Sequence, residues 1–213
     1  MEKITTTGLT NKYIKEHPYI RHCIKKELIN YSSLARLIAK ELNIEKESSK
    51  EAILIAARRF RDKIKKELQN EIEVKEVLSK SELEIKNKIE TIILEKSLDL
   101  DYIDKIQKKI RKEYGVFYLL EGSNSYTIII QEKYSDFIKN KFKHMIIRNN
   151  KNLFLITLKT SQKIEQVRGI IAYLTSLFAE NNVNIVEFFS CWVDTVFVID
   201  SEDLNKTINF LKF

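Results

Sequence analysis

The sequence has 213 residues and a formal net charge of +7; 44% of its residues are hydrophobic and 31% are charged, so it can bury a core and is not intrinsically disordered. Glycine (4 residues) and proline (1 residue) are too scarce for a collagen-like chain or for a catalytic scaffold built on many glycine loops. No run of about 18 apolar residues is present, and residues 1–10 lack the apolar core of a signal peptide. We therefore expect a soluble, cytoplasmic protein.

The positive charge is confined to the first third of the chain. Residues 1–70 hold 16 Lys and Arg against 9 Asp and Glu, whereas residues 71–213 hold 21 of each sign. Such asymmetry predicts a basic module joined to a neutral one. An ordinary solvated surface remains the alternative interpretation.

The first module is expected to be an all-α, helix-turn-helix-like head over residues 1–70. A short segment ends at Pro18, and apolar residues then recur at helical spacing in residues 19–28. Residues 30–33 supply a break and a hydroxyl N-cap before a second helix, and Ser48 or Ser49 with Glu51 forms an approximate capping box for a third. The second helix carries the stripe Leu34, Leu37, Ile38 and Leu42, and the third carries Ile53, Ala56, Ala57, Phe60, Ile64 and Leu68. We expect the module to end between Leu68 and Ser81.

The rest of the chain alternates between strand and helix patterns, in an order that occurs twice. The first series comprises a strand (83–94), a helix (100–113), a hairpin (116–120 with 126–130) and a helix (134–142). The second comprises a strand (153–158), a helix (170–180), a hairpin (183–189 with 195–199) and a helix (204–211).

This β-α-β-β-α order, repeated after roughly 70 residues, is the wiring of a ferredoxin-like α+β unit. We expect two units, residues 78–150 and 151–213. Residues 143–148 can supply the closing strand of the first unit, but the second unit ends without one. A strand from elsewhere in the chain or from a partner must cover that edge, or it stays open.

The stretch VRGIIAYLTSLFAENNVNI (residues 167–185) resembles the signature of ACT domains, which are ferredoxin-like regulatory modules that bind amino acids, usually between two copies. Residues 190–192 and 194–198 resemble the hairpin of the aspartokinase-type branch. The resemblance covers residues 153–200 well and residues 81–150 only by topology, as a degenerate copy. It implies tandem ferredoxin-like ACT-type units, an amino-acid effector and a homodimer.

Within this stretch Gly169 opens a helix after a polar loop. A glycine there lets a ligand approach the backbone, and helix N-terminal amides can hold a carboxylate. The resemblance implies that Asn184 matches an effector-binding asparagine and that Gln166 matches a polar ligand contact. Arg168 replaces the usual proline, and Asn182 replaces a glycine, although asparagine tolerates the left-handed conformation. We predict that the ligand is bound by Gln166, Arg168, Gly169 and Asn184. The alternative is that Gly169 and Asn184 have only a structural role, at the start of a helix and of a strand.

The last helix of the basic module carries a row of cations away from its apolar stripe. A cationic row at helical spacing is what phosphate binding needs. The predicted nucleic-acid contacts are Arg58, Arg59, Arg61 and Lys65. A solvated basic face is the alternative.

Catalytic signatures are missing from the sequence. It has no P-loop and no dinucleotide-binding glycine motif, and its three histidines are scattered. Cys191, on an apolar strand, is expected to be a small buried hydrophobe. We expect no cofactor, no metal and no enzymatic activity.

The chain is therefore interpreted as a regulator that senses a small molecule, with a basic head that contacts DNA. The alternative is an ACT-type dimerisation or docking subunit that regulates an amino-acid biosynthetic enzyme without binding nucleic acid.

Overall fold

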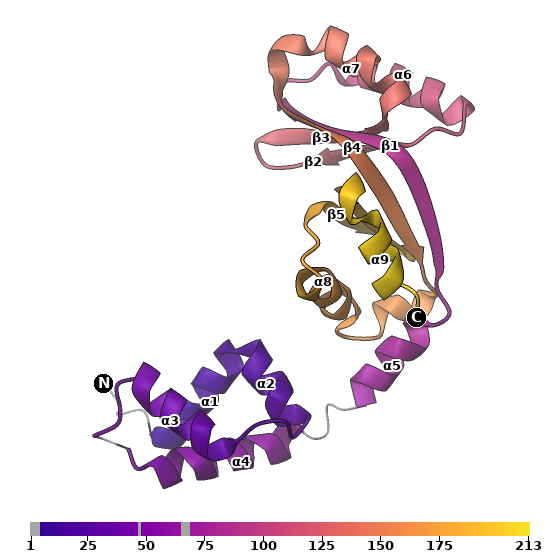
Figure 1. Ribbon diagram of the computed structural model, residues 1–213. Helices are drawn as coiled ribbons and strands as arrows, with labels where there is room; N and C mark the ends of the chain where they lie inside the picture. The colour runs from indigo at the N-terminus through magenta and orange to yellow at the C-terminus, as the bar shows by residue number, and fades with distance from the viewer. Residues whose placement is uncertain (1–4, 47, 65–68) are drawn as a thin grey trace. The chain divides into compact units, whose positions relative to one another are not determined.

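The computed structural model in Figure 1 describes residues 5–46, 48–64 and 69–213. The chain divides into two compact units, Met1–Glu73 and Val74–Phe213. The first is called the helical unit below, and the second is called the sheet unit.

The helical unit contains α1 (Thr6–Glu16), α2 (Pro18–Lys25), α3 (Tyr31–Glu41) and α4 (Lys50–Ile64). Thr5 caps α1 by accepting a hydrogen bond from the Gly8 N–H, and Pro18 occupies the first turn of α2, where its missing N–H costs nothing. The four helices bury one shared core, which includes Ile14, Ile24, Leu34, Ile38, Ile53 and Phe60.

Two details of the helical unit differ from the sequence prediction. The N-cap of α3 is a carboxamide rather than a hydroxyl, since Asn30 Oδ1 accepts from the N–H groups of Ser32 (3.0 Å) and Ser33 (3.1 Å). Leu37 is 41% exposed, because α3 turns Leu34, Ala35, Ile38 and Ala39 toward the core instead. The predicted cap at Ser49 is present, with Ser49 Oγ accepting from the Ala52 N–H at 3.1 Å. Leu68 lies outside the described residues.

Helix α5 (Gln69–Leu78) was not anticipated from the sequence. Its buried side chains Val74, Val77 and Leu78 join the core of the sheet unit. This i, i+3, i+4 stripe is narrow and the segment around it is rich in Glu and Lys, so the sequence pattern did not indicate a helix there.

The sheet unit contains one antiparallel sheet in the order β2-β3-β1-β4-β6-β5. Its strands are β1 (Glu82–Glu95), β2 (Phe117–Glu121), β3 (Ser125–Gln131), β4 (Ile146–Lys159), β5 (Ile185–Cys191) and β6 (Asp194–Asp200). Its other helices are α6 (Leu100–Lys112), α7 (Ser135–Lys141), α8 (Ile170–Glu180) and α9 (Leu204–Phe210).

Strands β1 and β4 are long enough to serve both halves of the sheet, as Figure 1 shows. The second half of β1 (89–95) pairs with β3, whereas its first half (82–86) pairs with the end of β4 (155–159), which in turn pairs with β6. The start of β1 therefore supplies the strand that the second repeat lacks.

The strands expected at 143–148 and 153–158 are one continuous strand, β4, and Lys143–Met145 is a 3₁₀ turn that precedes it. The polar residues between the two expected strands stay in the ladder, where Asn149 is opposite Ile92 and Asn150 is opposite Thr91.

The sheet curls where its two central strands are irregular. The β1–β4 ladder shifts register between Lys86 and Ile89, and Lys88 (φ 52°) and Asn152 (φ 56°) adopt left-handed conformations. Helices α6 and α7 cover one half-sheet, and α8 and α9 cover the other. The helix-free faces pack together through Ile129, Leu155, Val196 and Val198, and the rings of Tyr118 and Phe189 lie 4.8 Å apart.

An ion-pair cluster fastens the start of β1 to the end of β4. Lys159 Nζ lies 2.6 Å from one carboxylate oxygen of Glu84, and Lys86 Nζ lies 2.9 Å from the other. Hydrogen bonds from Lys159 and then Lys86 lower the pKa of Glu84 from 4.5 to about 2.

We expect Glu84→Gln to lower the free energy of unfolding at neutral pH by about 0.5–1 kcal/mol, a small effect because solvent screens these partly exposed groups. A depressed carboxyl pKa contributes stability that is present above 4.5 and lost as the pH falls toward about 2. Urea unfolding at several pH values should therefore show a weaker acid dependence in the variant, with Glu82→Gln as the control. Identical pH dependence in wild type and Glu84→Gln would contradict this assignment.

Candidate functional site: the start of helix α8

Helix α8 begins at a residue that leaves its first N–H groups accessible. Gly169 is the N-cap, with φ 92° and ψ 0°, and no side chain among the described residues caps the helix. The first turn contains no acidic residue, and a Cβ built at Gly169 would meet no described atom within 4 Å. The first N–H groups of α8 therefore lack a capping side chain among the described residues, and the positive end of the helix dipole lies there, an arrangement that suits a carboxylate.

The corresponding helix of the other half-sheet, α6, is closed at the same point. Asp99 is its N-cap and accepts a hydrogen bond from the Tyr102 N–H at 3.0 Å, and Asp101 adds a second carboxylate to the first turn. The Lys141 ammonium lies 3.7 Å from Asp99. An external anion would meet two like charges there, so of these two helices α8 is the one with an open start.

The loop before α8 is anchored at both ends. The N–H and hydroxyl groups of Thr160 both donate to the carbonyl of Val193 at 2.9 Å, which ties the loop to the β5–β6 hairpin. Ile164 and Val167 pack on the core below. Gln166 and Arg168 are exposed and adjoin Gly169 in the sequence, so these three predicted site residues lie in one short exposed segment.

A buried hydroxyl lies at the same end of the sheet. Thr195 is fully buried, and its Oγ1 has no hydrogen-bond partner among the described residues. Thr195 is opposite Leu158 in the register, so both side chains occupy the helix-covered face. Sequence reasoning did not select Thr195; the available signal was a lone hydroxyl residue in the apolar strand 195–199. Unpaired buried polar groups are uncommon in native proteins and call for a physical account.

Two lysines near the loop already have carboxylate partners. Lys159 pairs with Glu84, and Lys163 Nζ lies 3.9 Å from Glu76. Arg168 makes no ion pair with any residue that the structure describes. It is therefore the cation of this region that can meet an incoming anion.

Asn184 is not part of this cluster within one chain. It follows α8, whereas Gly169 precedes it, and an eleven-residue helix separates its ends by about 16 Å. Asn184 is exposed at that far end. Asn182 does adopt the predicted left-handed conformation, with φ 52°.

The predicted nucleic-acid residues lie at the end of α4. The Arg58 guanidinium is 5.7 Å from the centre of the Tyr31 ring, and Arg61 makes two hydrogen bonds to Asp62. Arg59 is exposed, and Lys65 lies outside the described residues. The Tyr31 hydroxyl is buried without a partner in the described part of the chain, and this burial raises its pKa.

Other chemical groups do not form a competing site. Cys191 is exposed rather than buried, because it ends β5, the outermost strand of the sheet. The buried Glu90 pairs with Lys139 and accepts a hydrogen bond from Ser135. Over residues 5–46, 48–64 and 69–213, no group of three His, Cys, Asp or Glu is placed to hold a metal ion, and no helix is long and apolar enough to cross a membrane.

The comparisons with known proteins bear on the fold. No protein-family model and no curated protein matches the sequence. Among solved structures, the aspartate kinase of Clostridium acetobutylicum, described as an allosteric enzyme, is similar with a TM-score of 0.50 and 16% identity. The match covers 61% of this chain and 33% of the kinase, so this chain corresponds to about a third of that protein.

Two regulatory fragments of aspartate kinases are also similar. A putative C-terminal regulatory domain from Porphyromonas gingivalis W83 is covered over 94% of its length by 62% of this chain, with a TM-score of 0.44 and 13% identity. The ligand-free regulatory subunit from Thermus thermophilus is covered over 92% by 61% of this chain, with a TM-score of 0.47 and 8% identity. Sequence identities this low indicate a similar fold and nothing further. The chain has an ACT-like α+β fold.

Valine substitutions at two buried threonines test whether the Thr195 hydroxyl lacks a hydrogen-bond partner. Thr195→Val should leave the free energy of unfolding unchanged or raise it by up to about 1 kcal/mol, because an unpaired hydroxyl is removed. Thr91→Val should lower it by about 1–3 kcal/mol, because Thr91 Oγ1 accepts a hydrogen bond from Asn150 Nδ2 at 2.9 Å. Urea unfolding compares the two fully buried positions. A loss at Thr195 as large as the loss at Thr91 would show that its hydroxyl has a partner.

Proposed function

We propose that the sheet unit is a non-catalytic regulatory pair of ferredoxin-like ACT-type units that binds an amino acid or a related carboxylate at the start of α8. The observation that carries this proposal is the open, glycine-led start of α8. Gln166, Arg168 and Gly169 form the site within one chain, and Asn184 is proposed to join it from a second copy.

The arrangement of the strands supports a tandem pair. Read from either edge, the sheet presents an outer hairpin followed by the two shared strands β1 and β4. Each half then has two helices over a four-stranded half-sheet. The likeness to an aspartate kinase, which its description calls allosteric, agrees with a regulatory role for such a pair.

The chemistry of the site favours one bound carboxylate per chain. The first N–H groups of α8 would hold the carboxylate, and Arg168 would add positive charge. Gln166 can both donate and accept hydrogen bonds, as the ammonium and side chain of a ligand require. The Asp99 cap keeps the first half from binding the same group, so the two halves differ in function.

Ligand binding can be tested on the full chain. We expect at least one of the twenty amino acids to raise the melting temperature and to titrate calorimetrically. Gly169→Val should abolish the signal, because a branched side chain fills the open space and disfavours φ 92°.

Gly122→Ala is the matched control, since Gly122 lies in the β2–β3 turn of the other half-sheet and its substitution should leave affinity unchanged. If calorimetry detects no heat of binding for any amino acid, the docking-subunit alternative stands, in which the sheet unit only binds a biosynthetic enzyme. Unchanged affinity in Gly169→Val would place the ligand site elsewhere.

A second candidate function, phosphate contact by the helical unit, is favoured by one observation. The Arg58 guanidinium lies 5.7 Å from the centre of the Tyr31 ring, so a cation and a hydroxyl-bearing side chain are neighbours. A hydroxyl next to a guanidinium is an arrangement that nucleic-acid-binding proteins use on phosphates. We propose Arg58, Arg59, Arg61 and Lys65 as the contacts with DNA.

Salt dependence tests this second candidate. The double variant Arg58→Glu, Arg61→Glu should bind duplex DNA more weakly, and the slope of log affinity against log salt should fall by roughly 0.9 for each phosphate that the protein no longer neutralises. The double variant Lys12→Glu, Lys15→Glu on α1 serves as a charge-matched control. Fluorescence anisotropy that detects no binding by the wild type at about 50 mM salt, a condition that favours such contacts, would rule the candidate out.

A further inference from the structure

A small depression lies where α1 meets α2 in the helical unit. It has a volume of about 210 Å³ and is lined by Lys15, Pro18, Arg21, His22 and Lys25. Among these described lining residues three are cations, one is a histidine and none is acidic. A pocket for a drug-sized ligand has roughly 300–1,000 Å³. The depression is smaller than that, so its size and charge suit one compact anionic group.

Helix α2 presents its part of the lining on a single face. The lining residues of α2 recur at the spacing i, i+3, i+4, i+7, which is that of one helix face: Pro18, Arg21, His22 and Lys25. The opposite face packs into the core through Ile24, which is fully buried. Arg21 and Lys25 stand four residues apart, a spacing at which like charges lower the stability of a helix. An anion bound between them would attract both.

The junction between the two helices fixes the backbone around the depression. Only His17 separates them, since α1 ends at Glu16 and α2 begins at Pro18. The centres of the His17 and Tyr13 rings lie 4.0 Å apart in a stacked arrangement, and His17 Nδ1 lies 2.7 Å from the Tyr13 carbonyl oxygen. The proline ring restricts the backbone in the first turn of α2. The backbone that carries Lys15 is therefore fixed relative to α2 without a ligand.

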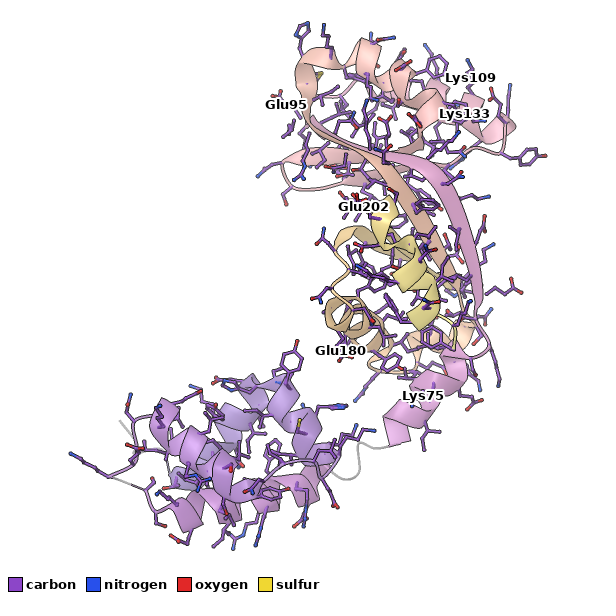
Figure 2. The ribbon with its side chains drawn as sticks, in the orientation of Figure 1. Lys75, Glu95, Lys109, Lys133, Glu180 and Glu202 are labelled. Carbon is purple, nitrogen blue, oxygen red and sulfur yellow. The ribbon has the colours of Figure 1, made fainter. Side chains whose placement is uncertain are left out.

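A depression in the sheet unit provides the contrast. It has a volume of about 300 Å³ and is lined by Asn87, Lys88, Gln131, Glu132 and Lys133. Its lining carries charges of both signs, and Lys133, which Figure 2 labels, lies over an aromatic ring, with Nζ 4.5 Å from the centre of Tyr134. An anion would meet the Glu132 carboxylate there. The purely basic lining therefore distinguishes the depression of the helical unit.

The donors around the depression match a phosphate group better than a carboxylate. A guanidinium such as that of Arg21 can donate to two oxygens of one phosphate, and the lysine ammonium groups bind phosphate as point charges. The His22 ring adds an N–H donor. A phosphate monoester carries a charge of about −1.5 to −2 at pH 7, whereas a carboxylate carries a single charge. Three cations therefore favour the phosphate.

We propose that the depression between α1 and α2 binds the phosphate group of a small soluble compound, through Lys15, Arg21, His22 and Lys25. Duplex DNA presents one charge per roughly 1.7 Å of its axis and is bound by an extended row of cations. A concave site of this size instead encloses one terminal phosphate or diphosphate. None of the four residues belongs to the DNA contacts proposed on α4 or to the carboxylate site proposed on α8.

Calorimetric titration of the full chain with inorganic pyrophosphate at about 50 mM salt tests the site. We expect saturable binding of one pyrophosphate per chain. Lys15→Glu should weaken it at least about tenfold, because it sets a carboxylate beside the bound anion. Lys12→Glu makes the same substitution one turn earlier on α1, outside the depression, and should leave the affinity unchanged. Both lysines are exposed, so neither substitution disturbs the core. Gly169→Val should also leave the pyrophosphate affinity unchanged.

Titration with a nucleoside diphosphate identifies the source of the phosphate. Tighter binding than that of pyrophosphate would show that the base adds contacts, for which Tyr19 on α2, 77% exposed, offers a ring. Equal affinities would show that the phosphates alone are recognised, and both outcomes support the site.

Three outcomes would overturn the proposal: no saturable binding of pyrophosphate, equal affinity in wild type and Lys15→Glu, or displacement of pyrophosphate by duplex DNA. The last would assign the depression to a nucleic-acid surface. None of them depends on whether an amino acid binds at Gly169 or whether α4 contacts DNA.

Discussion

The pairing of β1 with β4 is the interaction on which the rest of the sheet unit depends. Each strand has fourteen residues, and each gives one half of its length to each half-sheet. Neither half-sheet can therefore complete four strands without both long strands. The register shift near Lys88 then turns the helix-free faces toward each other, and the core around Leu155 and Val198 forms between them. We infer that the two repeats fold as one cooperative body rather than as separable domains.

The two halves share an architecture but treat the start of their first helix in opposite ways. Asp99 occupies the N–H groups of α6 with a carboxylate of the chain itself, and Gly169 leaves those of α8 open. The same division holds on the helix surfaces, since α6 is highly charged and α8 is not. The residue at each helix start, rather than the shared architecture, therefore decides where an external anion meets uncapped N–H groups.

Local features were predictable from the sequence because short-range chemistry determines them. The left-handed conformation of Asn182, the cap at Ser49 and the helix start at Gly169 all follow from residue type and spacing. The pairing of residues 82–86 with 155–159 was not predictable, because no local pattern specifies a partner seventy residues away. Likewise Thr195 is indistinguishable from an ordinary strand threonine until burial and register are known. The separation of Asn184 from Gly169, by contrast, follows from the helix expected at 170–180, because the two residues flank its opposite ends.

The proposed ligand site takes residues from two copies of the chain, and this has a thermodynamic consequence. A ligand held by Gly169 of one copy and by the partner's Asn184 would bind the dimer more tightly than the monomer. Linkage then requires the ligand to tighten the dimer by the same factor, because the coupling free energy is shared by both equilibria. A short helix with an open start and an uncharged face would thus couple ligand binding to subunit association, without a conformational change inside the sheet.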